Sequence, residues 1–281
     1  MKILNKIEEV RSVRKEIRDK ITGLIHLSGN IHPGSVQVVR KLCTMCEVRF
    51  ATIFLNPFIE NFHKIKNVCE NCLESDFSLL EEENVDYLFC PDVKEIFPED
   101  DLTSVYPEKI IEKFSPFKSE KYIVSTATLY FKLLNLFQPD FVFIGQKSFL
   151  ELFILKQIVK DFDMDVSVVV SPTLRNEEGI PFSSEIKTLD ESERKISSEI
   201  YSVLSSVRNA FSSGERNSSK LLNLLKEGLS KIEGFNLIKA EILSLKDLSE
   251  LENIEGESVL VLLGEVDGKK YTDALFLKSK I

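Results

Sequence analysis

Residues 28–35, with the sequence SGNIHPGS, could bind phosphate, and they lie between an apolar, strand-like run and a helix-like run. A glycine-bracketed turn that opens a helix leaves backbone N–H groups unpaired at the positive end of the helix dipole, where phosphate oxygens bind favourably. Gly29 and Gly34 bracket the turn, and His32 would stand beside the phosphates. The alternative is an ordinary turn between a strand and a helix, in which the glycines only permit tight backbone angles.

Four of the five cysteines form two Cys-x-x-Cys pairs, Cys43 with Cys46 and Cys69 with Cys72. Two such pairs are typical of a tetrathiolate site for zinc or an iron–sulfur cluster. Both pairs lie in helix-like segments, and the intervening residues 47–68 exceed the usual spacing. Reduced thiols packed in a hydrophobic core are therefore the alternative.

Composition limits the classes of protein that the chain can belong to. Its 281 residues, 43% of them hydrophobic and 29% charged, suffice for one large or two modest globular domains. A formal net charge of -9 argues against a nucleic-acid-binding surface, which needs concentrated basic residues. No apolar run approaches the roughly 18 residues of a membrane span, and the N-terminus carries no apolar signal segment. We therefore expect a cytoplasmic protein with no membrane partner.

The first 180 residues alternate between segments of strand and helix character. The pattern predicts strands at 21–27, 48–55, 85–91, 139–145 and 165–170, and helices at 3–20, 35–46, 65–83, 124–137 and 147–161. Short apolar strands separated by helices are typical of a parallel sheet with helices on both faces. We expect an α/β fold in which residues 1–180 form a Rossmann-like, doubly wound nucleotide-binding domain.

Residues 181–281 differ in character and predict a smaller α+β domain. Two polar helices are expected at 190–211 and 218–232, and strands at 240–245, 258–264 and 270–277, with a short helix after the first strand.

Several motifs resemble the pantoate:β-alanine ligase (pantothenate synthetase) family of the HIGH-type nucleotidyl transferase superfamily. Residues 29–35 (GNIHPGS) are similar to its G-x-L-H-x-G-H signature. Further matches follow in the same order at 53–57 (IFLNP), 93–98 (VKEIFP), 136–140 (LFQPD), 145–151 (GQKSFLE), 172–184 (PTLRNEEGIPFSS), 214–215 (GE) and 272–273 (TD). The resemblance therefore covers nearly the whole chain.

The resemblance implies a reaction in which ATP and pantoate form a pantoyl adenylate, from which β-alanine displaces AMP. It implies ATP and magnesium as cofactors, a pantoate-like acid as ligand, and a homodimer formed through the N-terminal domain. His32 and Lys147 would act in catalysis near the phosphates. The implied nucleotide-binding residues are Gly29, His32, Gly34, Gly145, Lys147, Ser183 and Ser184, and the implied substrate-pocket residues are Asn56, Ile59, Ser148, Glu151 and Arg175.

The chain departs from the family pattern where that pattern concerns chemistry. The second signature histidine is Ser35, and the arginine after the paired serines is Glu185. The pantoate-binding glutamine falls on Ile59, the aspartate after the lysine on Ser148, and the paired glutamines on Leu150 and Glu151. We interpret this as a degenerate active site in which the parent reaction is impaired. The alternatives are an active ligase or nucleotidyl transferase with a different acid, and a non-catalytic paralogue that binds a ligand or metal.

Overall fold

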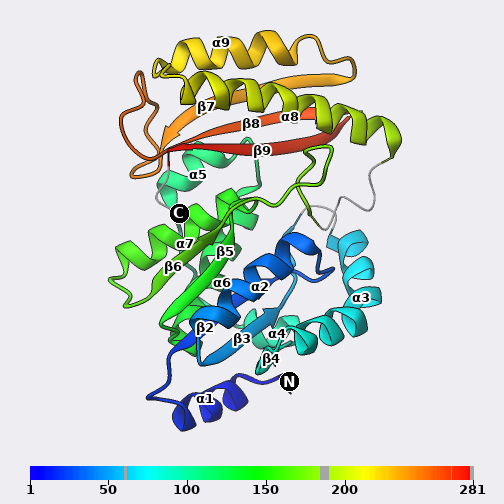
Figure 1. Cartoon of the computed structure of the whole chain (residues 1–281). Helices are drawn as coiled ribbons and strands as arrows, with labels where there is room; N and C mark the ends of the chain where they lie inside the picture. The colour runs from blue at the N-terminus through cyan, green and yellow to red at the C-terminus, as the bar shows by residue number, and fades with distance from the viewer. Residues whose placement is uncertain (60–61, 184–189, 267, 279–281) are drawn as a thin grey trace. The chain divides into compact units, whose positions relative to one another are not determined.

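The computed structural model describes residues 1–59, 62–183, 190–266 and 268–278, apart from the side chains of residues 63–72 and 278. The chain forms two compact units, Met1–Pro172 and Thr173–Ile281 (Figure 1). Residue 180, where we expected the first domain to end, lies within the second unit. In the described part, no helix is long and apolar enough to cross a bilayer.

The first unit is built on a parallel sheet whose six strands follow the order β1-β4-β3-β2-β5-β6. Its strands are β1 (Lys2–Leu4), β2 (Thr22–Leu27), β3 (Val48–Ile53), β4 (Tyr87–Phe89), β5 (Phe141–Gly145) and β6 (Ser167–Ser171). Its helices are α1 (Ile7–Glu16), α2 (Pro33–Met45), α3 (Phe62–Glu82), α4 (Val93–Ile96), α5 (Glu108–Phe114), α6 (Glu120–Phe137) and α7 (Phe149–Asp161).

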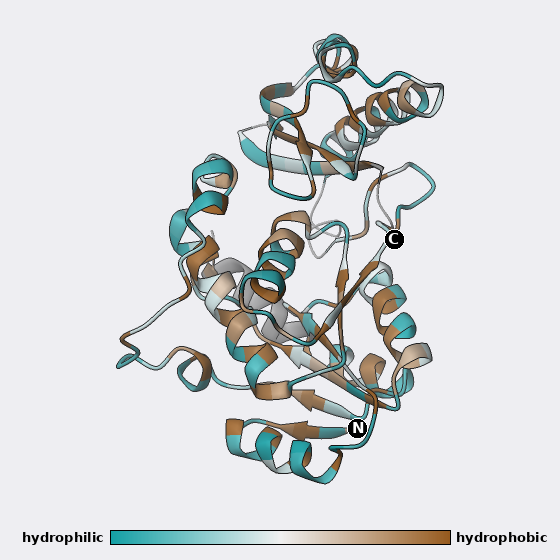
Figure 2. Ribbon diagram, turned by 90° about the vertical axis from the view of Figure 1, so that its left-hand side faces the viewer, coloured by the Kyte–Doolittle hydropathy of each residue, from teal (hydrophilic) through white to brown (hydrophobic). Residues whose placement is uncertain are grey.

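Helices cover both faces of this sheet. Successive strand residues point to opposite sides, so neighbouring residues of one strand pack against different helices. Leu24 of β2 packs in a cluster with residues of α1 and α6, whereas its neighbour Ile25 packs in a cluster with residues of α2 and α3. The apolar colouring of the strands and the mixed colouring of the helices follow this arrangement (Figure 2). The expected doubly wound α/β fold is confirmed.

The prediction of one helix over residues 3–20 was wrong at its beginning and its end. Residues Lys2–Leu4 form an edge strand, which pairs in parallel with β4. The helix begins after Lys6, whose backbone N–H donates to the Glu9 carboxylate at 2.9 Å, and it ends at Glu16. Helical spacing in Ile3 and Leu4 was outweighed by pairing with a strand more than 80 residues away, which periodicity does not reveal.

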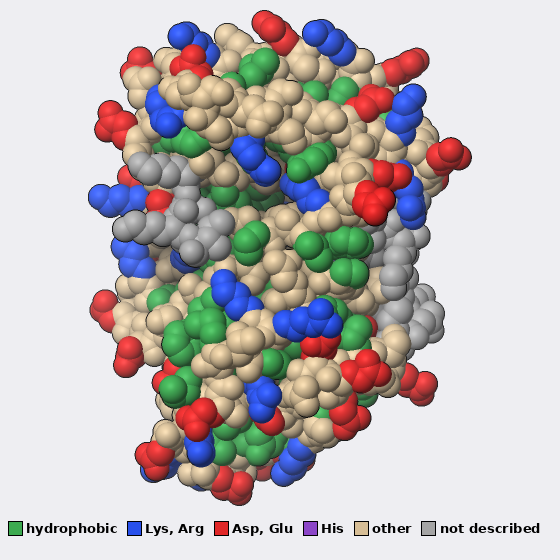
Figure 3. Space-filling view, viewed as in Figure 1, with side chains coloured by type: hydrophobic (Ala, Val, Ile, Leu, Met, Phe, Trp, Pro, Cys, Tyr) green, Lys and Arg blue, Asp and Glu red, His purple; other side chains and the backbone are tan. Residues whose placement is uncertain are grey.

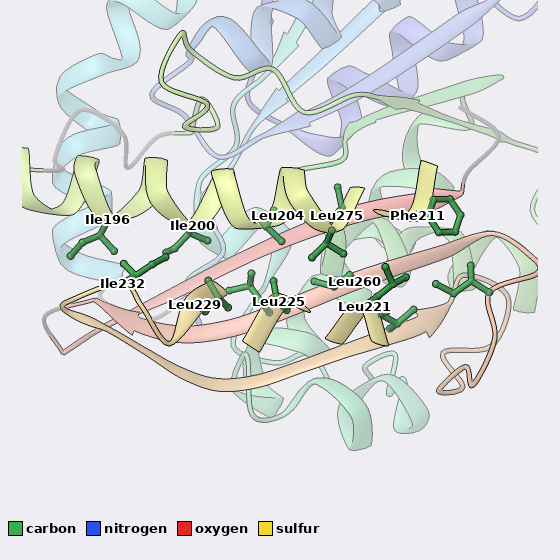
Figure 4. Packing of buried hydrophobic residues seen from close by; sticks show 14 of the residues in the cluster. Ile196, Ile200, Leu204, Phe211, Leu221, Leu225, Leu229, Ile232, Leu260 and Leu275 are labelled. Carbon is green, nitrogen blue, oxygen red and sulfur yellow. The ribbon is translucent and has the colours of Figure 1, made fainter. Parts of the chain in front are cut away.

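The second unit packs two helices on an antiparallel sheet of order β7-β8-β9. Its elements are α8 (Glu191–Ser212), α9 (Ser218–Leu229), β7 (Phe235–Ser244), β8 (Ser258–Val266) and β9 (Lys269–Lys278). Ile200 of α8, Leu225 of α9 and Leu260 of β8 are fully buried in one shared cluster (Figure 4). The short helix expected after the first strand of this unit is absent from the described residues 245–257, which form turns and isolated bridges.

Candidate functional site

The site lies where the strand order reverses, at the carboxyl ends of β2, β3 and β5. Strand β2 pairs on one side with β3 and on the other with β5, with Leu24 opposite Phe50 and Val142. In open parallel sheets, ligands bind in the crevice outside such a point. The loops after these three strands carry the motif residues of the turn at 28–32, the segment at 54–59 and the segment at 146–148.

The turn after β2 has the backbone geometry that its glycine permits. Gly29 and Asn30 both have positive φ, 88° and 52°. The N–H of Ile31 donates to Oδ1 of Asp76 on α3 at 2.8 Å, which holds the end of the turn. His32 is the N-cap residue of α2, Pro33 is its first residue, and Gly34 and Ser35 follow within the first turn. The N–H groups of that turn are thus directed at the carboxyl edge of the sheet.

A second strand–turn–helix junction lies beside the first. β5 ends at Gly145, residues 146–148 form a turn, and α7 begins at Phe149 after Ser148. The Gln146 N–H donates to the Ser171 carbonyl at 2.8 Å, which fixes this turn against the end of β6. Because β2 and β5 are parallel neighbours, the turn that carries Lys147 adjoins the turn that carries His32. Two helices, α2 and α7, therefore begin at one edge.

Asn56 organises the loop after β3. Its side-chain nitrogen donates to the hydroxyls of Ser125 and Thr126 at 2.8 and 3.1 Å, and its Oδ1 accepts from the Phe58 N–H at 3.0 Å. The Asn56 carbonyl also accepts from the N–H of Ile59 at 3.2 Å. Asn56 is 8% exposed. The structure thus uses this side chain to join the loop to α6.

A partly buried polar cluster lies against the same strand ends. Glu151, on α7, accepts a short hydrogen bond from the Tyr122 hydroxyl of α6. Burial, followed by the nearby Glu151 charge, raises the pKa values of Tyr122 and Tyr130, so both phenols stay protonated. The rings of Tyr130 and His26 meet in a T-shaped arrangement with centroids 5.9 Å apart. The expected substrate-pocket residue Glu151 therefore already has a protein hydrogen-bond partner.

His26, at the end of β2, is a neutral member of this cluster. Its Nδ1 lies 2.8 Å from Oγ1 of Thr52, the residue opposite it on β3. The residue as a whole keeps some exposed surface, and its ring contacts Thr52 and Tyr130. Burial lowers the pKa of the imidazole to about 4. His26 is consequently uncharged at neutral pH.

The remaining expected site residues belong to the second unit. Arg175 donates to both oxygens of Asp273 at 3.3 Å and to the Gly179 carbonyl at 3.1 Å, and it stacks over Tyr201. Ser183 is half-buried on the same segment. Ser184 and Glu185 lie outside the described residues. The guanidinium of Arg175 is thus engaged within its own unit.

The cysteines of the first pair are engaged in hydrogen bonding and core packing. The Cys43 thiol donates to the Glu83 carbonyl at 3.0 Å, and Cys46 is buried against β2 beside Gly23. Burial raises the pKa of both thiols, that of Cys46 to about 11, which disfavours the thiolate that binds metal. The side chains of Cys69 and Cys72 lie outside the described residues, and the described ones include no group of three His, Cys, Asp or Glu placed to hold a metal.

Sequence reasoning missed Asp76 and the Tyr122 hydroxyl. Asp76 is only 3% exposed although it stands in a polar helix, and Tyr122 reads as an ordinary apolar position of α6. Both reach the site through contacts between segments at least 29 residues apart. An acidic residue on the buried side of a helix was the one available signal, since unpaired buried carboxylates are rare.

Comparison with known proteins gives one consistent result. The family described as Pantoate-beta-alanine ligase matches residues 2–273. A pantothenate synthetase of Caldicellulosiruptor saccharolyticus is 30% identical over 264 residues, which are 93% of this chain and 94% of that protein.

Solved structures share the fold. The pantothenate synthetase of Thermus thermophilus superimposes with a TM-score of 0.88 at 24% identity, over 99% of this chain and 100% of that one. The pantoate-beta-alanine ligase of Francisella tularensis, solved in complex with beta-gamma ATP and beta-alanine, gives a TM-score of 0.76 at 24% identity, over 100% and 99%. This chain belongs to the pantoate-beta-alanine ligase family.

Proposed function

We propose that the chain binds ATP at the junction of β2 and β5, and that it makes pantothenate far more slowly than an unaltered member of its family. The family reaction joins pantoate to β-alanine through an adenylate. The observation that carries the nucleotide proposal is the adjacency of two strand–turn–helix junctions, one bearing His32 and the other Lys147.

Phosphate binding at these turns depends mainly on the backbone. The helix N-termini of α2 and α7 supply N–H groups and a positive dipole end, which no side-chain substitution removes. Lys147 would add a positive charge at the phosphates, and Gly29, Gly34 and Gly145 would let the backbone approach them. The resemblance also implies that Ser183 and Ser184 bind the nucleotide.

Magnesium fits this site as a companion of the nucleotide. The donors at the two turns are N–H groups and a lysine, which suit phosphate oxygens, and the described residues form no three-membered metal-ligand cluster. Mg²⁺ retains several waters and binds mostly through substrate phosphates in such sites. The ion would neutralise phosphate charge when bound.

The expected loss of pantothenate synthesis rests on two groups of replaced residues. Ser35 and Glu185 stand where the family has a histidine and an arginine, which would stabilise charge at the α-phosphate. Ile59 and Leu150 replace amides that would bind pantoate. Losing one preorganised donor at developing charge costs roughly 3 kcal/mol, or about two decades in rate. Effects within one site are not additive, so we expect a loss of several decades.

A second candidate function is adenylation of a different acid. The Glu151–Tyr122 hydrogen bond favours it, because a partly buried carboxylate, held by a phenol, has taken the place of an amide that would bind pantoate. A carboxylate at this position repels an acid group and favours a substrate that presents a donor instead. Pyrophosphate release in the presence of a panel of hydroxy and amino acids would identify such a substrate.

ATP binding is the direct test of the nucleotide proposal. We expect Lys147→Ala to weaken ATP binding by roughly tenfold, because a charged donor to phosphate is lost, and Lys147→Arg to retain most of it. Lys160→Ala, at an exposed position near the end of α7, is the matched control and should bind ATP like the unmodified chain. Equal ATP affinities of the Lys147→Ala and control variants would refute the assignment of Lys147.

The homodimer formed through the N-terminal domain also remains a proposal, supported by the family resemblance. Sedimentation as a monomer at micromolar concentration would contradict it.

A further inference from the structure

A cavity of about 640 Å³ opens in the first unit between α1 and the last turns of α6. A third wall comes from Glu95 and Ile96 at the end of α4 and from Pro98 and Asp101 in the following loop. Both helices end where the next strand begins, α1 before β2 and α6 before β5. The phosphate-binding turn instead follows the other end of β2, so this cavity is separate from the nucleotide site.

Basic residues of α1 and of the turn that follows it make this cavity strongly basic. Its lining includes Arg11, Arg14 and Lys15 of α1 and Arg18 just after it, and within the described chain none of these four forms an ion pair. The two acidic lining residues are already paired, Glu95 with Lys6 at 3.0 Å and Asp101 with Lys132. This local excess of positive charge contrasts with the net charge of -9 and with the interspersed signs on the face drawn in Figure 3.

Arg14 has buried donors that the protein does not satisfy. Its Nη2 donates to the Gln138 carbonyl at the end of α6 at 2.9 Å, but its Nε and Nη1 are buried with no hydrogen-bond partner. Burial also lowers the pKa of this guanidinium, with the Asp140 charge acting in the opposite direction. The hydrogen bond to the end of α6 therefore satisfies only Nη2 of the three guanidinium nitrogens. Unsatisfied buried donors are costly. Because Arg14 also lines the cavity, a rotation of its guanidinium would bring these donors to an anionic acceptor there.

The other walls of the cavity are largely apolar. They include the side chains of Ile7, Ile96, Pro98, Phe131, Leu133 and Leu136. A cavity of this volume, with apolar walls and a few convergent polar groups, is typical of small-molecule sites. An inorganic anion alone would leave these walls without a partner.

We propose that this cavity is a second ligand site, which binds a small carboxylate with an apolar body. The carboxylate would accept hydrogen bonds from Arg14, with Arg11 and Arg18 adding charge, and the apolar body would lie against α6. Arg pairs well with carboxylates because its guanidinium offers several donors and stays charged.

Hexanoate is a suitable probe, measured by isothermal titration with the full chain. We expect hexanoate to bind, and 1-hexanol and inorganic phosphate to bind at least tenfold more weakly. 1-Hexanol lacks the carboxylate, and phosphate lacks the apolar chain. Arg14→Gln should weaken hexanoate binding by at least tenfold, while its amide can still donate to the Gln138 carbonyl. Arg208→Gln, at an exposed site on α8, and Lys147→Ala should leave hexanoate binding unchanged.

Three results would overturn the proposal: no binding of hexanoate at millimolar concentration, equal binding by the Arg14→Gln variant, or equal binding of phosphate. Loss of hexanoate binding in Lys147→Ala would also overturn it, since the probe would then occupy the nucleotide site. If Arg14→Gln does not fold, Arg11→Gln, at an exposed position, provides the same test with a smaller expected effect.

Discussion

Arg175 is a residue for which the family resemblance and the geometry suggest different roles. The resemblance places it near the substrate, but its donors bind Asp273 and the carbonyl of Gly179. The side chains of Arg175 and Asp273 are 11% and 2% exposed. Gly179 has a φ of 80°, and a Cβ there would lie 1.8 Å from the Tyr201 ring. We therefore infer that Arg175 holds the turn at 175–181 against β9.

Removal of this guanidinium tests that inference. Arg175→Met should destabilise the second unit by about 3 kcal/mol, because it leaves the Asp273 carboxylate buried without its partner. Urea unfolding measures the change. The control is Lys220→Ala, which breaks an exposed pair with Glu215 and should change stability by less than about 0.5 kcal/mol. Equal losses in the two variants would show that the Arg175 pair does not stabilise the fold.

His26 should make stability depend on pH. Its pKa is about 4 in the folded chain, against an ordinary value of 6.5, so the unfolded chain binds more protons between these values. The contribution of the neutral His26 to the free energy of unfolding is therefore fully present above about pH 6.5. It is lost as the pH falls toward about 4, which lowers the free energy of unfolding by up to roughly 3 kcal/mol.

The measurement compares urea unfolding of the unmodified chain with His26→Gln at about pH 7.5 and about pH 5. Glutamine can still hydrogen-bond to Thr52 but does not titrate, so the difference between the two proteins isolates the imidazole. Parallel pH profiles would contradict the low pKa of His26.

At the scale of elements, the position of the turn at residues 28–32 depends on close packing of α2 on β2. A Cβ on Gly23 would lie 2.3 Å from Cδ1 of Leu42 and 2.5 Å from Sγ of Cys46. Both are buried side chains of the α2 segment. Glycine at this point allows the helix to approach the strand whose end carries the turn.

Gly23→Ala should therefore destabilise the first unit by about 1–3 kcal/mol, because buried side chains must move to admit the methyl group. The same displacement of α2 should weaken ATP binding. Gly256→Ala is the matched control, since a Cβ there meets no atom within 4 Å. A thermal transition of Gly23→Ala that coincides with that of the control would refute the packing argument.

Elements whose identity depends on local pattern could be predicted from the sequence, and those that depend on distant partners could not. β2, β5 and α2 follow from apolar runs, a glycine turn and a proline at the helix start. β1 needs its partner β4, and the segment 245–257 needs the Leu243–Glu250 and Asn217–Asn253 bridges. The contact of Asp76 with the turn at residues 28–32 likewise spans 45 residues of sequence.

At the scale of the whole molecule, family membership and the substituted positions lead to different expectations for activity. The family matches residues 2–273, and the strand ends and turns that would hold ATP are present. The substitutions affect side chains that would bind pantoate and stabilise charge, while the scaffold motifs persist. We therefore expect nucleotide binding to survive and pantothenate synthesis to be largely lost.

The most direct test is AMP release by the full chain that depends on both pantoate and β-alanine at saturating ATP, with Ser35→His/Glu185→Arg as the restoring variant. We expect turnover several decades below roughly 1 per second, ATP binding in the same preparation, and a faster reaction in the restoring variant. Pantothenate formation by the unmodified chain at about 1 per second or faster would contradict the account.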